Sequence, residues 1–139
     1  MNVTTKWQGD QYKQKVGKGL SGNLDRAAIV YVSLVRRSFG DSGISGMISG
    51  ATRSQRAANR SKPGEPPNVD TGHLKRNVGW TKYTKRKNTR KVGTGIGNKQ
   101  SVGYASWLEY GTRKMAARPF LRPIMSRREW RAELTRPVG

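Results

Sequence analysis

The sequence predicts an α+β fold, in which a small antiparallel sheet packs against a long N-terminal helix and a C-terminal helix. Three patterns favour this class: an apolar stripe of helical period near the N-terminus, two alternating stretches in the middle, and a proline-led stretch near the end. A long loop separates the first helix from the sheet. Because 139 residues is the usual length of one domain, we expect residues 1–139 to form a single domain around one core.

The first helix is expected at about residues 20–38. Asn23 or Ser21 can cap its beginning, and Gly40, which tolerates a positive φ, follows its end. Glycine inside a helix costs about 0.5–1 kcal/mol relative to alanine, so Gly17, Gly19 and Gly22 predict a break at its start. Its inward positions follow three- and four-residue steps: Leu20, Leu24, Ala27, Ala28, Tyr31, Leu34 and Val35.

Residues 41–68 are expected to form the long loop. Glycine and serine dominate its beginning, and Pro63, Pro66 and Pro67 near its end disfavour both helix and central strand. Apolar residues within 44–48 have the spacing of a short helical turn. A loop of this length in a small domain usually carries function, and the other interpretation is a solvated, flexible loop.

The sheet is expected from two stretches in which apolar and polar residues alternate, residues 74–80 and 92–96. Between them, the basic residues Lys85–Arg90 form the tip of a hairpin. The glycine-rich run at 93–97 superficially resembles a phosphate-binding loop. It lacks the Gly-Lys-Ser/Thr ending, so a strand with bulges fits it better.

The C-terminal part is expected to pack on this sheet. Residues 104–110 form a short, mostly apolar segment, and Pro119 suits the first turn of a last helix that runs to about Leu134. The inward side of that helix would carry Phe120, Ile124, Met125, Trp130 and Leu134. The side chains expected to anchor the core are Trp80, Tyr104, Trp107, Leu108 and Phe120.

The reactive side chains argue against an enzyme. The chain has no cysteine, which excludes disulfides, zinc ribbons and thiol chemistry, and His73 is its one histidine. Its eight acidic residues are scattered, and none belongs to an Asp/Glu-x-Lys triplet, a spacing found in metal-dependent nucleases. Asp41, Glu65 and Asp70 could hold Mg²⁺ from one loop, but Asp70 more simply caps a turn at Thr71-Gly72. We therefore predict no catalytic residue, no metal site and no cofactor.

No membrane segment is expected either. The longest strongly apolar stretch, Ala27–Val35, has nine residues, whereas a spanning helix needs about 20. Charged residues interrupt the N-terminal region where the apolar part of a secretory signal would stand. We expect the protein to stay in the compartment where it is made.

The charge of the chain is strongly positive. Its formal net charge is +20, and residues 71–100 hold nine Lys and Arg without any Asp or Glu. Dense basic charge without a base-reading motif favours contact with phosphates and no sequence preference, although a solvated basic face is the other interpretation. The residues predicted to contact DNA phosphates are Lys82, Lys85, Arg86, Lys87, Arg90 and Lys91 of the hairpin and Arg53, Arg56 and Arg60 of the loop.

Several motifs follow one another in an order that is typical of one family. They are Pro66-Pro67, Asp70-Thr71-Gly72-His73-Leu74, Val92-Gly93-Thr94, the segment 104–112 with its Glu-Tyr-Gly-Thr, and the segment 115–123 with its Arg-Pro-Phe-Leu-Arg-Pro. Together they resemble the tail-completion proteins of long-tailed double-stranded DNA bacteriophages, also called head-to-tail joining or minor tail component proteins. The resemblance covers roughly residues 63–125. The stretch 41–60 departs from the shorter linker typical of that family.

The resemblance implies a structural protein of the virion, assembled in the host cytoplasm and without catalysis. Copies would form a ring, typically of six, at the junction of the tail tube and the head connector, around the double-stranded DNA. Its partners would be further copies of the chain, tail-tube or terminator proteins, and head-connector proteins. The predicted assembly interface comprises Glu109, Arg113, Arg118, Arg122, Arg127 and Arg128. Arg118 and Arg122 are the stronger candidates, because they flank the anchored Phe120-Leu121.

A second function remains open from the sequence. Composition alone favours a free protein that binds nucleic acid without sequence preference, whereas the order of motifs favours the ring. Against specific RNA recognition, the strands lack the aromatic signature of RNA-binding sheets, and Trp80 with Tyr83 makes a weak stacking pair.

Overall fold

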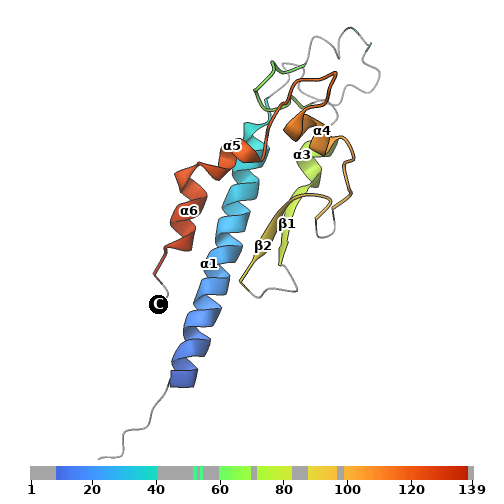
Figure 1. Ribbon diagram of the computed structural model, residues 1–139. Coiled ribbons are helices and arrows are strands. Elements are labelled where there is room, and N and C mark those ends of the chain that lie inside the picture. Colours follow the sequence, from blue (N-terminus) through green and yellow to red (C-terminus); the bar gives the residue numbers. More distant parts are fainter. Residues whose placement is uncertain are drawn as a thin grey trace, which may run out of the picture.

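The computed structural model describes residues 9–40, 52, 54, 60–69, 72–82, 88–96 and 99–137. Its long helix α1 (Gly9–Ser38) has the hairpin of β1 (Val78–Lys82) and β2 (Arg90–Thr94) on one side and helix α6 (Arg128–Leu134) on the other (Figure 1). Three short helices complete the described fold: α3 (His73–Asn77), α4 (Ala105–Tyr110) and α5 (Arg122–Met125). The α+β prediction is confirmed.

Helix α1 continues through the three glycines and begins at Gly9, so the predicted break is wrong. Each glycine costs about 1 kcal/mol at most, which is not enough to interrupt a helix whose later turns are held by packing. Asn23 is not a cap: it is buried inside α1, and its Nδ2 donates to the carbonyl oxygens of Leu134 and Arg136 at 3.4 and 2.8 Å. Asn23 thereby satisfies carbonyls at the C-terminal end of α6.

Gly40 follows α1 for a reason other than the one predicted. Its φ is not positive, but a Cβ there would collide with the side chain of Asn68. The two residues form an isolated parallel bridge, and the amide of Val69 donates to the carbonyl of Gly40 at 3.0 Å. Gly40 therefore allows the segment before α3 to lie against the end of α1.

The first predicted strand begins later than expected. Val78 pairs with Thr94 and Lys82 with Arg90 in an antiparallel register, whereas Leu74 lies in α3. Asn77 fixes the turn from α3 into β1, since its Nδ2 donates to the His73 carbonyl at 2.9 Å and its Oδ1 accepts the Gln100 amide at 3.0 Å. Because Leu74 and Val78 are four residues apart, a helical turn also directs both to the core.

The second predicted strand, residues 92–96, is placed two residues too late, because β2 ends at Thr94. Gly95 then adopts a φ of +67°, and a Cβ on it would lie 2.8 Å from the Cα of Ser101. Glycine permits both this conformation and the close approach. Of the expected hairpin tip, Lys85–Arg90, residues 85–87 lie outside the described residues, Asn88 lies in a turn, and Arg90 already belongs to β2.

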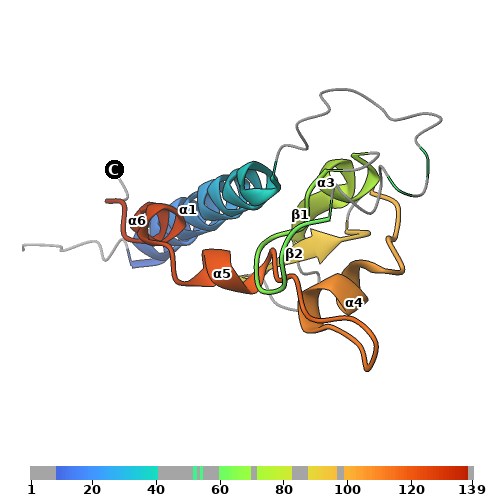
Figure 2. The ribbon, with the colours of Figure 1, turned by 90° about the horizontal axis from the view of Figure 1, so that it is seen from above.

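The core lies between the last turns of α1, the start of β1 and the segment around α5, which Figure 2 shows close together. Phe120 is buried, as predicted, and its ring centroid lies 5.4 Å from that of Phe39. Trp80 and Leu108 are half-buried and pack against the core. Tyr104 and Trp107 are exposed, so their prediction as core anchors is wrong. The cause is the orientation of α4, which turns Ala105, Leu108 and Glu109 inward.

The single C-terminal helix predicted from Pro119 is also wrong, because α5 and α6 are separated at Ser126–Arg127. The indole of Trp130 donates to the carbonyl of Ile124 at 2.9 Å across this bend, and its ring meets Tyr31 edge-on at 5.6 Å. The bend leaves Met125 56% exposed. Among the described helices, none is long and apolar enough to cross a membrane.

Candidate assembly surface

Glu109, the penultimate residue of α4, binds the beginning of α5. Its Oε2 accepts the amides of Phe120 and Leu121 at 2.8 and 3.0 Å, and its Oε1 accepts the amide and the Nε of Arg122 at 2.9 and 3.2 Å. Arg122 returns a bond from Nη2 to the Glu109 carbonyl at 2.6 Å. The two motif segments 104–112 and 115–123 are therefore joined by one carboxylate.

The surroundings of Glu109 favour its charged form. Burial raises the pKa of this carboxyl group, but the hydrogen bonds from Leu121, Phe120 and Arg122 outweigh burial and lower the pKa below its ordinary value. Burial, and then the charge of Glu109, raise the pKa of Tyr31 to about 12. The Tyr31 hydroxyl donates to the Leu121 carbonyl at 2.7 Å, which ties α1 to the same segment.

The prediction of Glu109 as an assembly residue is therefore wrong. The residue is 4% exposed, and both carboxylate oxygens are occupied within the chain. Its role is to fix α4 against α5. No signal in the sequence pointed to this role, because a separation of 13 residues does not predict the contact with Arg122. The three backbone donors cannot be recognised either, since almost every residue carries an amide.

Fixing α4 in this way exposes one of its sides. Tyr104, Trp107 and Tyr110 follow one another at three-residue steps and are 42%, 59% and 70% exposed. The guanidinium of Arg122 lies 5.0 Å from the ring centroid of Tyr110. We call these three aromatic residues with Arg122 the α4 aromatic face. Trp, Tyr and Arg are the residues most enriched at energetically important positions of protein interfaces, so this face has the composition of a docking surface.

The other predicted assembly arginines lie apart from one another. Arg113 is exposed in the turn after α4, whereas Arg118 is half-buried and its Nε donates to the Ser61 carbonyl at 3.0 Å. Arg127 is exposed at the bend between α5 and α6 and pairs with Glu129 at 3.7 Å, and Arg128 is exposed beside it. Arg113 is thus the member nearest to α4 along the chain, whereas Arg122 lies against α4 in space through its contacts with Glu109 and Tyr110.

The predicted DNA contacts are also divided by the structure. The prediction of Arg90 as a DNA contact is wrong, because its side chain is 5% exposed and pairs with Asp25. Its Nη2 also donates to the hydroxyl and carbonyl oxygens of Ser21. Lys82 is exposed and 3.4 Å from Asp25. Burial raises the pKa of Asp25, but the hydrogen bond and charge of Arg90 and the charge of Lys82 outweigh it and lower the pKa. These contacts hold the hairpin on α1.

Of the remaining predicted DNA contacts, Lys91 and Arg60 are exposed. Lys85, Arg86, Lys87, Arg53 and Arg56 lie outside the described residues.

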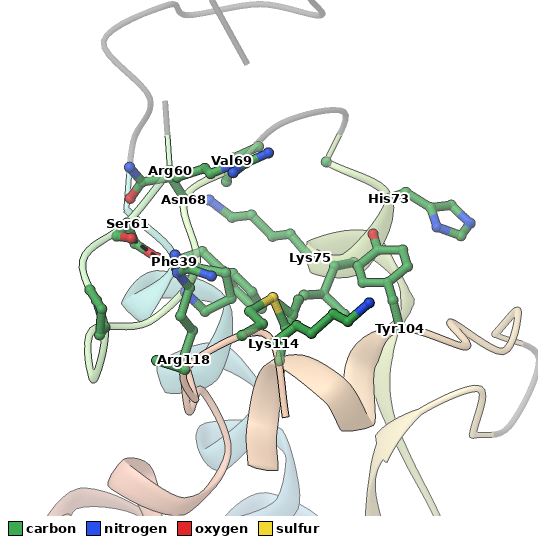
Figure 3. Close-up of a pocket in the computed structure, with 17 residues that line it drawn as sticks. Phe39, Arg60, Ser61, Asn68, Val69, His73, Lys75, Tyr104, Lys114 and Arg118 are labelled. Carbon is green, nitrogen blue, oxygen red and sulfur yellow. Dashed lines mark hydrogen bonds between the residues drawn. The ribbon is translucent and has the colours of Figure 1, made fainter. Parts of the chain in front are cut away.

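A pocket of about 680 Å³ opens next to α4, between the segment 60–69, α3 and the turn after α4 (Figure 3). Its floor is apolar, and the described residues that line it include no Asp or Glu. In Figure 3, Lys75 extends across the pocket from α3, and Lys114 extends toward Tyr104. The basic lining residues are Arg60, His73, Lys75, Lys114 and Arg118. The sequence did not bring these five together, because they come from three segments whose meeting depends on the fold.

Comparison of the chain with models of protein families, with curated proteins and with solved structures gave no match. The site must therefore be interpreted from its own geometry. Among the described residues, no group of three His, Asp or Glu side chains has a placement suited to holding a metal ion. What the arrangement offers is an exposed aromatic face beside a basic pocket, and this combination suits contact with another macromolecule.

Proposed function

We propose that the chain is a structural protein that assembles with copies of itself into a ring at the head-tail junction of a long-tailed DNA phage. There it completes the tail and joins it to the head connector around the DNA. The observation that carries this proposal is the contact of Glu109 with the amides of residues 120–122. The two motifs most responsible for the resemblance are parts of one folded unit, and that unit displays the α4 aromatic face.

The charge of such a ring sets the chemistry of its partners. Six copies would carry a charge of +120 in total, from +20 for each chain. We take the length of helix α1 as the depth of the ring: its 30 residues span about 45 Å at 1.5 Å per residue. A DNA duplex of that length carries only about 26 negative charges. Most of the positive charge must therefore be balanced by small ions or by acidic surfaces of neighbouring proteins, and isolated copies should repel one another.

We expect the purified protein to be mostly monomeric at low salt and to form rings on phage tails that lack it. Light scattering across salt concentrations measures the first property, and electron microscopy of tails mixed with the protein measures the second. The double variant Trp107→Ala with Tyr110→Ala should leave most tails incomplete while its thermal midpoint stays unchanged, because both side chains are exposed.

The matched control is Tyr12→Ala, which removes an equally exposed aromatic side chain from the far end of α1. This variant should complete tails as the wild type does. If the α4 variant also completes tails normally, the α4 aromatic face is not the interface. A stable closed ring of the isolated protein at low salt would contradict the repulsion argument.

The alternative function is that of a free protein that binds nucleic acid without sequence preference. It is favoured by the nine basic residues between 71 and 100, of which Lys82 and Lys91 are exposed on the described part of the hairpin. DNA held inside a ring would use the same contacts. The two functions differ in one respect: a free nucleic-acid-binding protein acts without phage tails, whereas a ring protein acts only when it assembles on them.

We expect duplex DNA binding to weaken steeply with salt and to be the same for unrelated sequences. The double variant Lys82→Gln with Lys91→Gln should reduce the slope of log affinity against log salt by about 0.9 for each lysine that contacts a phosphate. Fluorescence anisotropy with labelled duplexes measures this slope, with Lys15→Gln and Lys18→Gln as the control of equal charge. Binding that ignores salt, or that depends on sequence, would contradict phosphate contact.

If the hairpin variant binds as tightly as the wild type, replacement of Arg53, Arg56 and Arg60 tests the long loop in its place. Loss of binding there would move the contact from the hairpin to the loop.

A further inference from the structure

The pocket beside α4 is not explained by the proposed ring. It is concave and lies where the end of α1, α3 and the turn after α4 meet (Figure 3). Its volume of about 680 Å³ lies in the range typical of ligand sites. Folding does not require this hollow, because the core residues Phe120 and Val35 are already fully buried.

The rim of the pocket is positively charged. Arg60, Lys75, Lys114 and Arg118 line it, and in the described part of the chain none of the four pairs with a carboxylate. This differs from Arg90, whose charge is balanced by Asp25. Four cations around one hollow, with no carboxylate paired to them among the described residues, attract a ligand with several negative charges.

The floor of the pocket is apolar. Phe39, Leu74 and Leu108 form it together with Val69 and Met115. A phosphate group or a nucleic-acid backbone gains nothing from such a floor, because its contacts are with charged and polar groups. A peptide can use both parts, with carboxylates on the rim and an apolar side chain on the floor.

We propose that this pocket binds an acidic segment of a partner protein, in which Asp or Glu residues flank one large apolar residue. The inference rests on the proposed function for the source of that partner, which would be a neighbouring protein of the assembled tail. It agrees with the need for acidic surfaces around a ring of basic chains. Tyr104 belongs both to the pocket lining and to the α4 aromatic face, so a bound segment can continue onto that face.

The test measures binding of a short fluorescent peptide in which Asp and Glu residues flank one Phe, at one fixed ionic strength. The double variant Lys75→Gln with Lys114→Gln should bind this probe about tenfold more weakly than the wild type, as expected for two lost contacts between charged groups. The control variant Lys15→Gln with Lys18→Gln has the same net charge but changes exposed lysines on α1. It should bind within about twofold of the wild type.

Two further probes separate the chemistry of the ligand. A peptide with the same acidic residues but glycine in place of the Phe should bind clearly more weakly, because it leaves the floor empty. A single-stranded oligonucleotide of equal charge should compete poorly for the pocket. Equal binding of both peptides, equal weakening by the two lysine pairs, or preferred binding of the oligonucleotide would each overturn the proposal.

These outcomes are distinguishable from failure of the proposed function. If the chain completes phage tails but does not bind the acidic peptide, the pocket proposal is wrong and the ring remains. If the peptide binds in the pocket but the chain does not act on tails, the ring is wrong and the acidic-segment site remains.

Discussion

Replacing Phe120 by alanine should lower the free energy of unfolding by about 3–5 kcal/mol, which is a large part of the total stability of a small domain. Phe120 is 1% exposed and packs against Phe39 from the end of α1. Its amide donates to Glu109, and this bond survives the change because it belongs to the backbone. The variant therefore isolates the loss of the ring and the cavity it leaves.

Urea denaturation measures this loss directly, and the thermal midpoint should fall by about 10 °C or more. Met125→Ala is the matched control, because it removes a large side chain from the same segment at an exposed position. Its free energy of unfolding should change by no more than about 0.5 kcal/mol. A thermal midpoint of the Phe120 variant that scarcely moves would mean that the ring is not part of the core.

The success at Phe120 and the failures at Tyr104 and Trp107 have one physical origin. Residues 119–123 carry a proline on each side of an apolar pair, a pattern that places the aromatic ring beside a fixed turn. In residues 104–110 five of the seven positions are apolar or aromatic, so periodicity could not decide which side faces the core. The decision came from Glu109, whose contacts lie 11 to 13 residues further along the chain.

Contacts between distant residues account for the other differences. Arg90 appeared to belong to a basic hairpin, but its partner Asp25 is 65 residues away in the sequence, on α1. The stripe predicted on α1 was right at Ala27, Ala28 and Val35, which are buried, because a single helix sets their common side. It was wrong at Leu20, which is 43% exposed, and it did not include the buried Val32. The pocket required three segments to meet, and no local pattern expresses such a meeting.

Replacing Glu109 by glutamine should cost about 2–3 kcal/mol of folding stability at neutral pH. Glutamine has the shape of glutamate but offers one acceptor oxygen, and its amide group would face two of the donors that the second carboxylate oxygen now binds. At least one buried backbone amide near Phe120 then lacks an acceptor. Glu129→Gln is the control, because this glutamate is exposed and its pair with Arg127 is long; its effect should stay within about 0.5 kcal/mol.

The loss at Glu109 should depend on pH in a defined direction. Burial raises the pKa of this carboxyl group, but its hydrogen bonds lower the pKa further, so the folded state holds the proton less tightly than the unfolded state. The stabilisation is therefore present above the ordinary pKa of 4.5 and is lost as the pH falls through the lower pKa of the folded state. The free-energy difference between wild type and Glu109→Gln should shrink in acid, whereas the small effect of Glu129→Gln should not follow that course.

The titration of Tyr31 at high pH is a second way to measure the effect of the Glu109 charge. Burial first, and then Glu109, raise the pKa of Tyr31 from 10.0 to about 12, so the folded state keeps this hydroxyl protonated. That contribution to stability is fully present below pH 10 and is lost as the pH rises toward the folded pKa. In Glu109→Gln the pKa of Tyr31 should fall, which ultraviolet absorbance of tyrosinate can follow against a Tyr31→Phe background. An unchanged Tyr31 titration together with unchanged stability at neutral pH would mean that the Glu109 carboxylate does not hold the motif segments together.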